Sequence, residues 1–161
     1  MAFTIDGTNG LTFNNATTQA SGSKVLQVVN ATYGTQVSST TTGYIDTGLT
    51  ATITPLFATS KILVLVSQNG CWKTSANTGN ALDIKLIGGN TGSPLFSGAL
   101  SETDSAINNS VTASLCYLDS PATTSATTYK TQFQSRNNTA TVYVQYAGIS
   151  ISYITLMEIA A

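Results

Sequence analysis

The chain has 161 residues, of which only 8% are charged, and its formal net charge is −1. This length suits one domain with a substantial core, and six scattered Lys and Arg side chains cannot neutralise a run of phosphates, so a nucleic-acid partner is not expected. The sequence has no histidine, which excludes a Cys2His2 zinc site and His-based acid–base catalysis, and no apolar run long enough to span a bilayer.

The first 23 residues contain only a few large side chains, separated by Gly, Asn and Thr. Such a segment cannot form a hydrophobic core of its own. We therefore expect residues 1–23 to be an N-terminal arm that becomes ordered when it docks on a neighbouring subunit, or else a disordered leader. The candidate docking side chains are Phe3, Ile5, Leu11 and Phe13. Residues 24–161 would then form the folded domain.

Strand patterns follow one another from Lys24 onwards. Lys24 to Asn30 is apolar on both faces except at one position, and Leu49 to Thr54 alternates strictly between apolar residues and threonine. Between these two strands, the polar run Ser38 to Gly43 is predicted to be a turn or loop. Pro55 ends the second strand, because proline has no amide proton to donate to a ladder.

The segment Lys61 to Gln68, KILVLVSQ, is the most hydrophobic of the predicted strands. Ile62, Val64 and Val66 would point to one face of the strand, and Leu63 and Leu65 to the other. Because neither face suits water, we expect a central strand with one face against an opposing sheet. The other face then needs cover, which a subunit interface or the packed arm would supply.

The second half of the chain continues the strand pattern. Asn69-Gly70 is predicted to be a tight turn, and apolar residues alternate with Asp83 and Lys85 in the strand that follows. Residues 90–109 are predicted to be the longest loop, and loops of that length are usually functional or mobile. Four further strands are predicted, over residues 111–117, 129–133, 141–147 and 151–159.

This pattern contains eight or nine short strands and no helical period. Short strands at such spacing, joined by Gly, Asn and Pro turns, are typical of all-β domains. We therefore predict a single jelly-roll-like β-sandwich of about eight strands with an extended N-terminal arm. A closed barrel is the alternative.

Catalysis is not expected from the reactive residues. A glycosidase needs two carboxylates that face each other across a cleft, and only Glu102 and Asp104 are close together in sequence. Both are expected to be solvated loop charges, and the spacing of a calcium loop is absent. No base is present to activate a serine, and no Gly-x-Ser-x-Gly elbow occurs. The sequence thus predicts no enzyme, no metal and no cofactor.

Four other residues allow more than one interpretation. Trp72 with nearby tyrosines would form either a sugar-stacking platform or, more commonly, an aromatic group packed at a sheet edge or subunit contact. Cys71 and Cys116 are expected to be free thiols, with one inter-strand disulfide as the alternative. Glu158 lies in an apolar strand, so its carboxylate must reach solvent or accept a hydrogen bond from a donor. One candidate position for that donor is across a three-fold axis. The candidate receptor or partner contacts are Trp72, Glu102 and Asp104.

The order of the segments resembles a module of tailed-bacteriophage virion appendages. GLTFNNATTQASG, at residues 10–22, resembles the "GLTF…GTTQ…A" segment of phage tail-fibre chains, except that Asn14-Asn15-Ala16 stands where those chains usually carry Pro-Asp-Gly. The later matches to a phage fibre or appendage β-sandwich are KVLQVVNATYGTQVSSTTTGYIDTGL, TATITP, SKILVLVSQ, YLDSPATTSATTYKTQFQS, TVYVQ and SYITLMEIA. Together these segments span almost the whole chain.

The resemblance implies a structural protein of the virion, and such modules commonly form trimers. An arm with one domain is more similar to a capsid decoration, or cement, protein than to a complete tail fibre. We therefore expect a homotrimer on the capsid surface that binds the major capsid protein or another virion protein and stabilises the head shell. The alternative is a tail-fibre or spike domain that binds host surface glycan through a loop such as residues 90–109.

Overall fold

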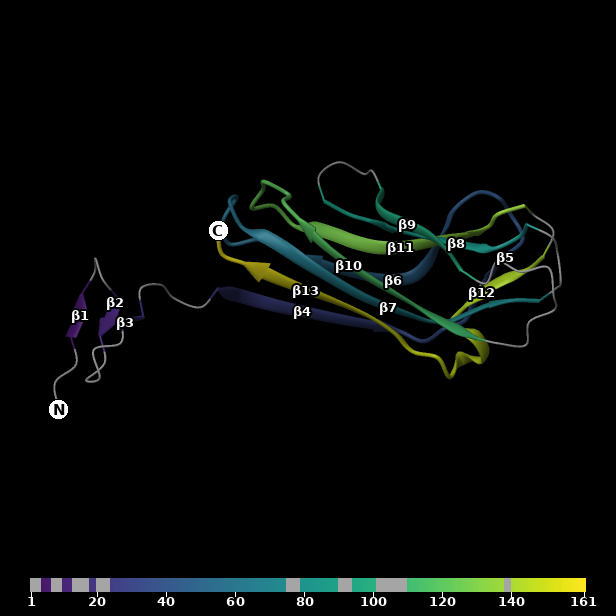
Figure 1. The fold of residues 1–161 in the computed structure, drawn as a ribbon, viewed down its shortest axis with the longest axis horizontal. Helices are drawn as coiled ribbons and strands as arrows, with labels where there is room; N and C mark the ends of the chain where they lie inside the picture. Colours follow the sequence, from purple (N-terminus) through teal and green to yellow (C-terminus); the bar gives the residue numbers. More distant parts are fainter. Residues whose placement is uncertain are drawn as a thin grey trace.

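The computed structural model describes residues 4–6, 10–12, 18–19, 24–74, 79–89, 94–100, 110–137 and 140–161. In these residues the chain is all-β, and the single helical element is the 3-10 turn η1 (Tyr146–Gly148). Two antiparallel sheets pack face to face, which confirms the predicted β-sandwich (Figure 1).

The first sheet contains six strands and the second contains four. The first has the order β4 (Val25–Tyr33), β13 (Ser152–Ile159), β7 (Lys61–Lys73), β12 (Val142–Val144), β5 (Val37–Ser39), and β10 (Val111–Asp119) also pairs with β7. The second has the order β6 (Ile45–Ile53), β11 (Thr127–Ser135), β8 (Leu82–Ile87), β9 (Pro94–Leu100). The sandwich thus has one or two strands more than the eight or nine that the sequence pattern predicts, because β5 is short and β9 has an irregular pattern.

Three short strands in the arm pair only with each other among the described residues. They are β1 (Thr4–Asp6), β2 (Gly10–Thr12) and β3 (Thr18–Gln19). Figure 1 draws them in purple, apart from the sandwich and on the side where the chain enters it. Phe3 and Phe13 lie outside the described residues, and only the backbone is described at Ile5 and Leu11. The docking role of residues 1–23 therefore stays a prediction.

Strand β7 is the central strand of the first sheet, as its sequence predicts. β13 and β10 flank it over residues 62–67, and β12 pairs with its last two residues. Ile62, Val64 and Val66 are buried against the second sheet, whose strands contribute Leu49 and Tyr129 to the same cluster. These side chains supply the main hydrophobic stabilisation of the sandwich, at about 1.5–3 kcal/mol for each fully buried aliphatic side chain.

A layer of buried polar side chains divides the core into two clusters. Gln68 follows the first cluster on β7, donates to the Ser152 hydroxyl at 2.9 Å and accepts from the Thr131 hydroxyl at 2.8 Å. Thr131 also pairs with Thr47 at 2.6 Å. Beyond this layer, a second cluster that includes Phe133 fills the other half of the sandwich. These hydrogen bonds offset the cost of burying the four side chains, while the side-chain oxygen of the buried Gln145, which donates to Ser152 at 3.2 Å, has no partner among the described residues.

Asn69-Gly70, predicted to be a tight turn, instead lies within β7. Gly70 has a positive φ of 65°, and the register of the β10 pairing shifts opposite it, between Val111 and Ala113. The dipeptide therefore forms a bulge and does not end the strand. A side chain at Gly70 would clash with the backbone nitrogen of Tyr146, so this position needs glycine for space as well as for conformation.

Two other predicted boundaries were wrong. The stretch predicted as a loop over residues 90–109 contains β9, which is an edge strand paired only with β8, and an edge position tolerates Pro94. The strand predicted over residues 141–147 stops at Val144, because Gln145 takes a left-handed conformation with φ 51° and ψ 44°. That conformation turns the chain into η1 and exposes Tyr146, which simple alternation would place inside.

Glu158 is fully buried on β13, and its partners come from its own chain, so the suggested contact across a three-fold axis is not needed. Its carboxylate accepts hydrogen bonds from the Gln27 side chain at 2.6 Å and from the backbone N–H groups of Leu56 and Phe57 at 2.8 and 3.3 Å. Burial raises the pKa of Glu158, but these hydrogen bonds, first that of Gln27, lower it by more, so the pKa lies below its ordinary value.

We expect stability to depend on the ionisation of Glu158. Because its pKa is lower in the folded chain than the value of about 4.3 for an unfolded chain, its contribution is complete above that value and is lost as the pH falls through the folded-state pKa. Urea unfolding between about pH 7 and pH 3 should show a steeper loss of stability for the wild type than for Glu158→Gln. The variant should be less stable at neutral pH by on the order of 1–3 kcal/mol.

Asp46 provides the control for this experiment. Its carboxylate pairs with Lys130 at 2.8 Å but is largely exposed, so water screens the interaction. Asp46→Asn should change the pH profile much less than Glu158→Gln. Parallel profiles for the wild type and Glu158→Gln would contradict the role given to Glu158.

Candidate functional site

The middle of the outward side of the first sheet carries uncharged side chains, and the exposed Lys61 of β7, which pairs with Ile159, lies beyond them. Strands β4, β13, β7 and β10 lie side by side there, and their pairing aligns outward side chains in three rows of four. We call this surface the outer sheet face. Its rows are Val28, Met157, Leu63, Leu118; Asn30, Thr155, Leu65, Cys116; and Thr32, Tyr153, Ser67, Ser114.

The first row of the outer sheet face is wholly apolar. Val28 and Leu118, at its two ends, are 54% and 50% exposed, and the two side chains between them are partly buried. In the second row Leu65 is 37% exposed. Water therefore reaches aliphatic side chains on four adjacent strands, which is unusual for a contiguous surface of a monomeric protein.

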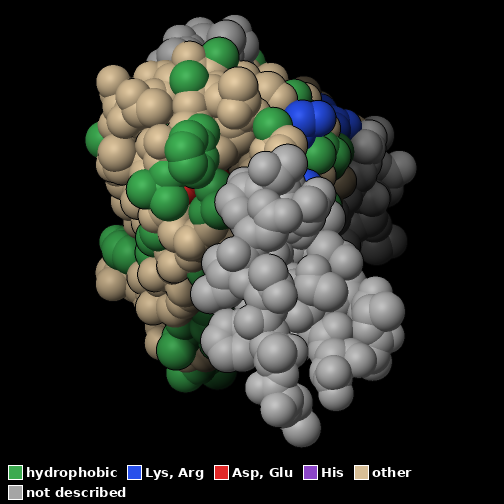
Figure 2. Space-filling view, turned by 90° about the vertical axis from the view of Figure 1, so that its left-hand side faces the viewer, with side chains coloured by type: hydrophobic (Ala, Val, Ile, Leu, Met, Phe, Trp, Pro, Cys, Tyr) green, Lys and Arg blue, Asp and Glu red, His purple; other side chains and the backbone are tan. Residues whose placement is uncertain are grey.

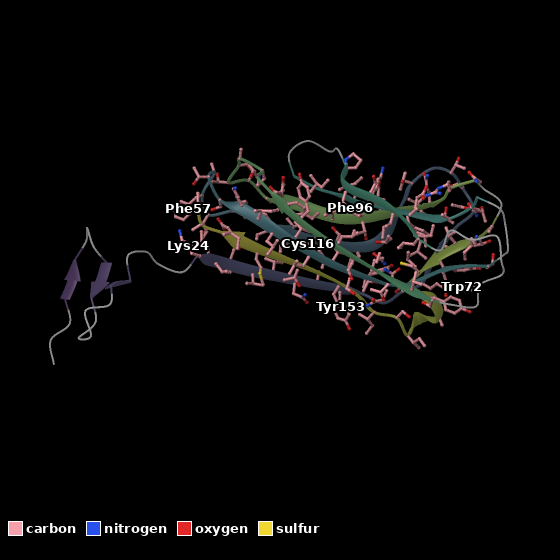
Figure 3. The ribbon with its side chains drawn as sticks, in the orientation of Figure 1. Lys24, Phe57, Trp72, Phe96, Cys116 and Tyr153 are labelled. Atoms are coloured by element: carbon pink, nitrogen blue, oxygen red, sulfur yellow. The ribbon has the colours of Figure 1, made fainter. Side chains whose placement is uncertain are left out.

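The second and third rows surround a depression with a volume of about 310 Å³, which we call the central hollow. Two large side chains, Leu65 and Tyr153, stand at its sides. The other outward side chains that line it are small, namely Ser67, Ser114, Cys116 and Thr155. Figure 3 labels Cys116 and Tyr153 partway along the sandwich. The depression arises because neighbouring strands place small residues between larger ones.

The outward side of the second sheet has the opposite character. Lys130 pairs with Asp46, and Arg136 pairs with Asp83, each at 2.8 Å. The ammonium group of Lys85 lies 4.0 Å from the centre of the Tyr44 ring. This contrast indicates that the second sheet faces water, whereas the outer sheet face suits a dry contact.

Three aromatic side chains gather near the far end of the sandwich, away from Lys24 (Figure 3). The ring of Trp72 on β7 lies 5.3 Å from that of Tyr143 on β12 and 4.6 Å from that of Tyr146 in η1. The two tyrosine rings are 5.9 Å apart in an edge-on arrangement. Cross-strand pairing of Trp72 with Tyr143 explains the first contact, and the left-handed turn at Gln145 brings in Tyr146. The rings cover one another, as expected of an aromatic group packed on a sheet.

The two cysteines are free thiols in different surroundings. Cys71 is buried in the second hydrophobic cluster, whereas Cys116 is exposed on the outer sheet face. This agrees with the free-thiol interpretation and not with the inter-strand disulfide. Burial raises the pKa of the Cys71 thiol to about 12. Cys71 is therefore expected to be inert towards reagents that need a thiolate.

The structure brings together only part of the candidate site that the sequence suggests. Trp72 does lie among tyrosines, namely Tyr143 and Tyr146, which the sequence did not single out, and Glu102 and Asp104 lie outside the described residues. Reasoning from one strand at a time also missed the outer sheet face as a whole. The available signal was the apolar residues at the outward positions of β13, such as Met157 and Tyr153, which alternate with buried ones.

Comparison with known proteins finds solved structures of low similarity. No protein-family model matches the chain, and no curated protein matches it. A VP2 subviral particle of infectious bursal disease virus is 15% identical over 89% of this chain and 40% of that chain, with a TM-score of 0.42. The T=1 particles derived from that virus give 14% identity over 98% of this chain and 44% of that chain, with a TM-score of 0.44. The chain thus spans less than half the length of these proteins.

The part of the chain that the structure describes contains neither a metal-binding cluster nor a membrane-spanning helix. No group of three or more Cys, Asp or Glu side chains is placed to hold a metal ion there. No helix in the same residues is long and apolar enough to cross a membrane.

We predict that the two thiols differ sharply in reactivity. In dilute native protein, Ellman's reagent should modify Cys116 quickly and leave Cys71 unmodified, because Cys71 is buried and its pKa is raised to about 12. Both thiols should react after unfolding in guanidinium. Cys116→Ser should remove the native reaction only. Rapid modification of Cys71 in the folded chain would contradict the packing described for β7.

Proposed function

We propose that the chain is a homotrimeric structural protein of a bacteriophage virion, and specifically a decoration protein that binds and stabilises the head shell. The observation that carries the proposal is the outer sheet face, which exposes aliphatic side chains and has no charge in its three rows. The segments that resemble phage virion modules support the virion setting. The action of such a protein is mechanical, so that no catalytic residue or cofactor is needed.

The energetics favour a second copy as the partner of the outer sheet face. Burying apolar surface gains about 25 cal/mol per Å², and a stable interface removes about 800 Å² from water on each partner. A charge in such an interface would have to be desolvated, and the outer sheet face carries none. The same face of a second copy, or an uncharged surface next to that face, is therefore a suitable partner. Every chain carries such a surface.

The edges of the first sheet support the same conclusion. β4 has no charged residue or proline, and β10 has none before Asp119, its last residue. Natural proteins usually protect exposed edge strands with lysine, proline or bulges. β4 has one such device, a bulge near its start where its register with β13 shifts. The rest of β4, and β10 before Asp119, lack charge and proline and are expected to be covered in the assembled protein.

We expect Leu118→Asp to prevent trimer formation. Leu118 is half exposed in the single chain, so the variant should fold normally, but it would place an unpaired charge in the interface. Light scattering after gel filtration should give the mass of a trimer for the wild type and of a monomer for the variant. In the wild type, modification of Cys116 should slow as the protein concentration rises.

Phe96→Asp is the matched control, because Phe96 is an exposed large side chain on β9 of the other sheet. This variant should remain a trimer. A wild-type chain that stays monomeric at high micromolar concentration, or a Leu118→Asp variant that still forms trimers, would refute self-association through the outer sheet face.

The arm is proposed to attach the trimer to the head shell. Lys24, where the arm joins the sandwich, accepts a hydrogen bond from the Ala160 N–H at 2.8 Å, so the arm leaves from the end that also holds the C-terminus. Figure 2 looks at this end of the molecule, where few charged atoms are visible beside the grey residues. Three arms on one trimer would bind with a high effective concentration.

Deletion of residues 2–22 should abolish attachment without unfolding the domain. Multivalent binding depends on the arms, whereas the contacts of the sandwich start at Lys24. Purified wild-type and deleted chains would be added to particles that lack the protein, and occupancy would be measured by sedimentation and electron microscopy. Circular dichroism checks that the deleted chain is folded. Full occupancy by the deleted chain would refute the docking role of the arm.

A second candidate function is host-glycan recognition by a tail fibre or spike, which the cluster of Trp72, Tyr143 and Tyr146 favours. Aromatic rings are common in sugar-binding surfaces, because one face of a sugar ring is apolar. This candidate requires glycan-array binding that Trp72→Ala abolishes. Immunogold labelling of intact particles separates the two functions, since decoration places many copies on the head and a fibre places a few at the tail.

A further inference from the structure

The loop between β12 and β13 raises one aliphatic side chain above the outward side of the first sheet. Ile149 is 85% exposed, more than any other large hydrophobic side chain in the described residues. Ser150, next to it, lies directly over Gly70 of β7, the position where a side chain would clash with the loop. Figure 1 shows this olive-coloured segment projecting beyond the strands at the end away from the N-terminus.

The loop is held firmly although it projects. The N–H of Gln145 donates to the carbonyl of Asn69 at 2.9 Å, and the N–H of Ala147 donates to the side-chain oxygen of Gln36 at 2.7 Å. The Asn69 side chain donates to the carbonyl of Ile151 at 2.6 Å. Gln145 and Ala147 both have positive φ, at 51° and 60°, a conformation that non-glycine residues adopt only where their surroundings impose it.

The exposed Ile149 side chain and the central hollow are both uncharged, and both lie on the outward side of the first sheet. The hollow is open to solvent, is lined by uncharged side chains and has a volume of about 310 Å³, which accommodates an aliphatic side chain. Ile149 is uncharged and without cover of its own, and hydrogen bonds at Ala147 and Ile151 hold the loop on either side of it. A preorganised aliphatic side chain loses little conformational freedom when it enters such a pocket.

Ile149 does not fill the central hollow of its own chain. Its side chain is 85% exposed, and the residues that line the hollow do not include it. The near wall of the hollow, at Ser67, lies three residues before Gly70 on β7, and the loop lies over Gly70. The hollow is therefore open in the single chain and can receive Ile149 of another molecule.

We propose that Ile149 of one copy inserts into the central hollow of the next copy. The contact joins two different surfaces of the same chain, so it is heterologous, and three such contacts form a closed trimer if each copy is turned by about 120° from the last. The inference rests on the self-association in the proposed function and specifies how the copies meet. It assigns Ile149 as the anchor side chain, and Leu65, Cys116 and Tyr153 as the walls that receive it.

Cys116 allows a direct chemical test, because it lines the hollow and is exposed in the single chain. In Ile149→Cys, the new thiol of one copy should lie next to Cys116 of its neighbour. Diamide would be the oxidant, and for each disulfide it accepts the two electrons and two protons that the thiols release. Covalent dimers and closed trimers should then appear on a non-reducing gel. A bridge within one chain would leave the mass of a monomer on the gel, so covalent dimers and trimers report contacts between copies.

Three variants serve as controls. Ile149→Cys combined with Cys116→Ser should give no covalent oligomer, since one partner is missing. Thr128→Cys, an exposed position on the other sheet, should leave the chain uncrosslinked. Ile149→Asp should fold normally, because Ile149 is exposed, and should lose the trimer mass in light scattering.

The outcomes separate this inference from the function on which it rests. A trimer that Ile149→Cys does not crosslink, or a wild type that crosslinks through Cys116 alone, overturns the insertion of Ile149 and leaves self-association standing. A wild type that is always monomeric overturns both. If Cys116 of the monomeric Leu118→Asp variant reacts only after residues 2–22 are deleted, the arm fills the hollow, and the proposal is wrong.

Discussion

The bulge at Asn69-Gly70 is the constraint on which the arrangement of the first sheet depends. Asn69 hydrogen-bonds to Ser152 of β13 and to Ile151 just before it, to Thr112 of β10, and to Gln145 of the loop. β7 pairs with β13 before this point and with β12 after it. One residue thereby fixes the junction of four segments. Because the bulge leaves no room for a side chain at Gly70, it also seats the loop that carries Ile149.

The separation of charge between the two outward sides of the sandwich links the fold to the proposed function. A chain with so few charged residues could scatter them evenly, yet the described ion pairs lie on the second sheet, and the outer sheet face has none. The interior is occupied by the two hydrophobic clusters and the polar layer. The exposed apolar side chains of the first sheet are not part of this interior. They are therefore available to stabilise an assembly.

Much of the architecture followed from residue patterns, but the candidate site did not. Alternation along Leu49 to Ile53 and along β8 identified the inward side chains correctly, because a strand has a period of two. The outer sheet face is made by four strands that are distant in sequence, so its rows exist only once the register is set. The same applies to the aromatic group, in which Tyr146 joins Trp72 only through the left-handed turn at Gln145.

The sequence by itself determined an all-β chain with β7 at the centre of a sheet, because five consecutive aliphatic residues suit only a strand that is flanked on both sides. Tertiary structure decided that Asn69-Gly70 continues the strand and that Glu158 is satisfied within its own chain. It also decided that Ile149 projects beside a hollow. Each of these depends on hydrogen bonds or close contacts between residues far apart in sequence, and local propensity carries no information about such partners.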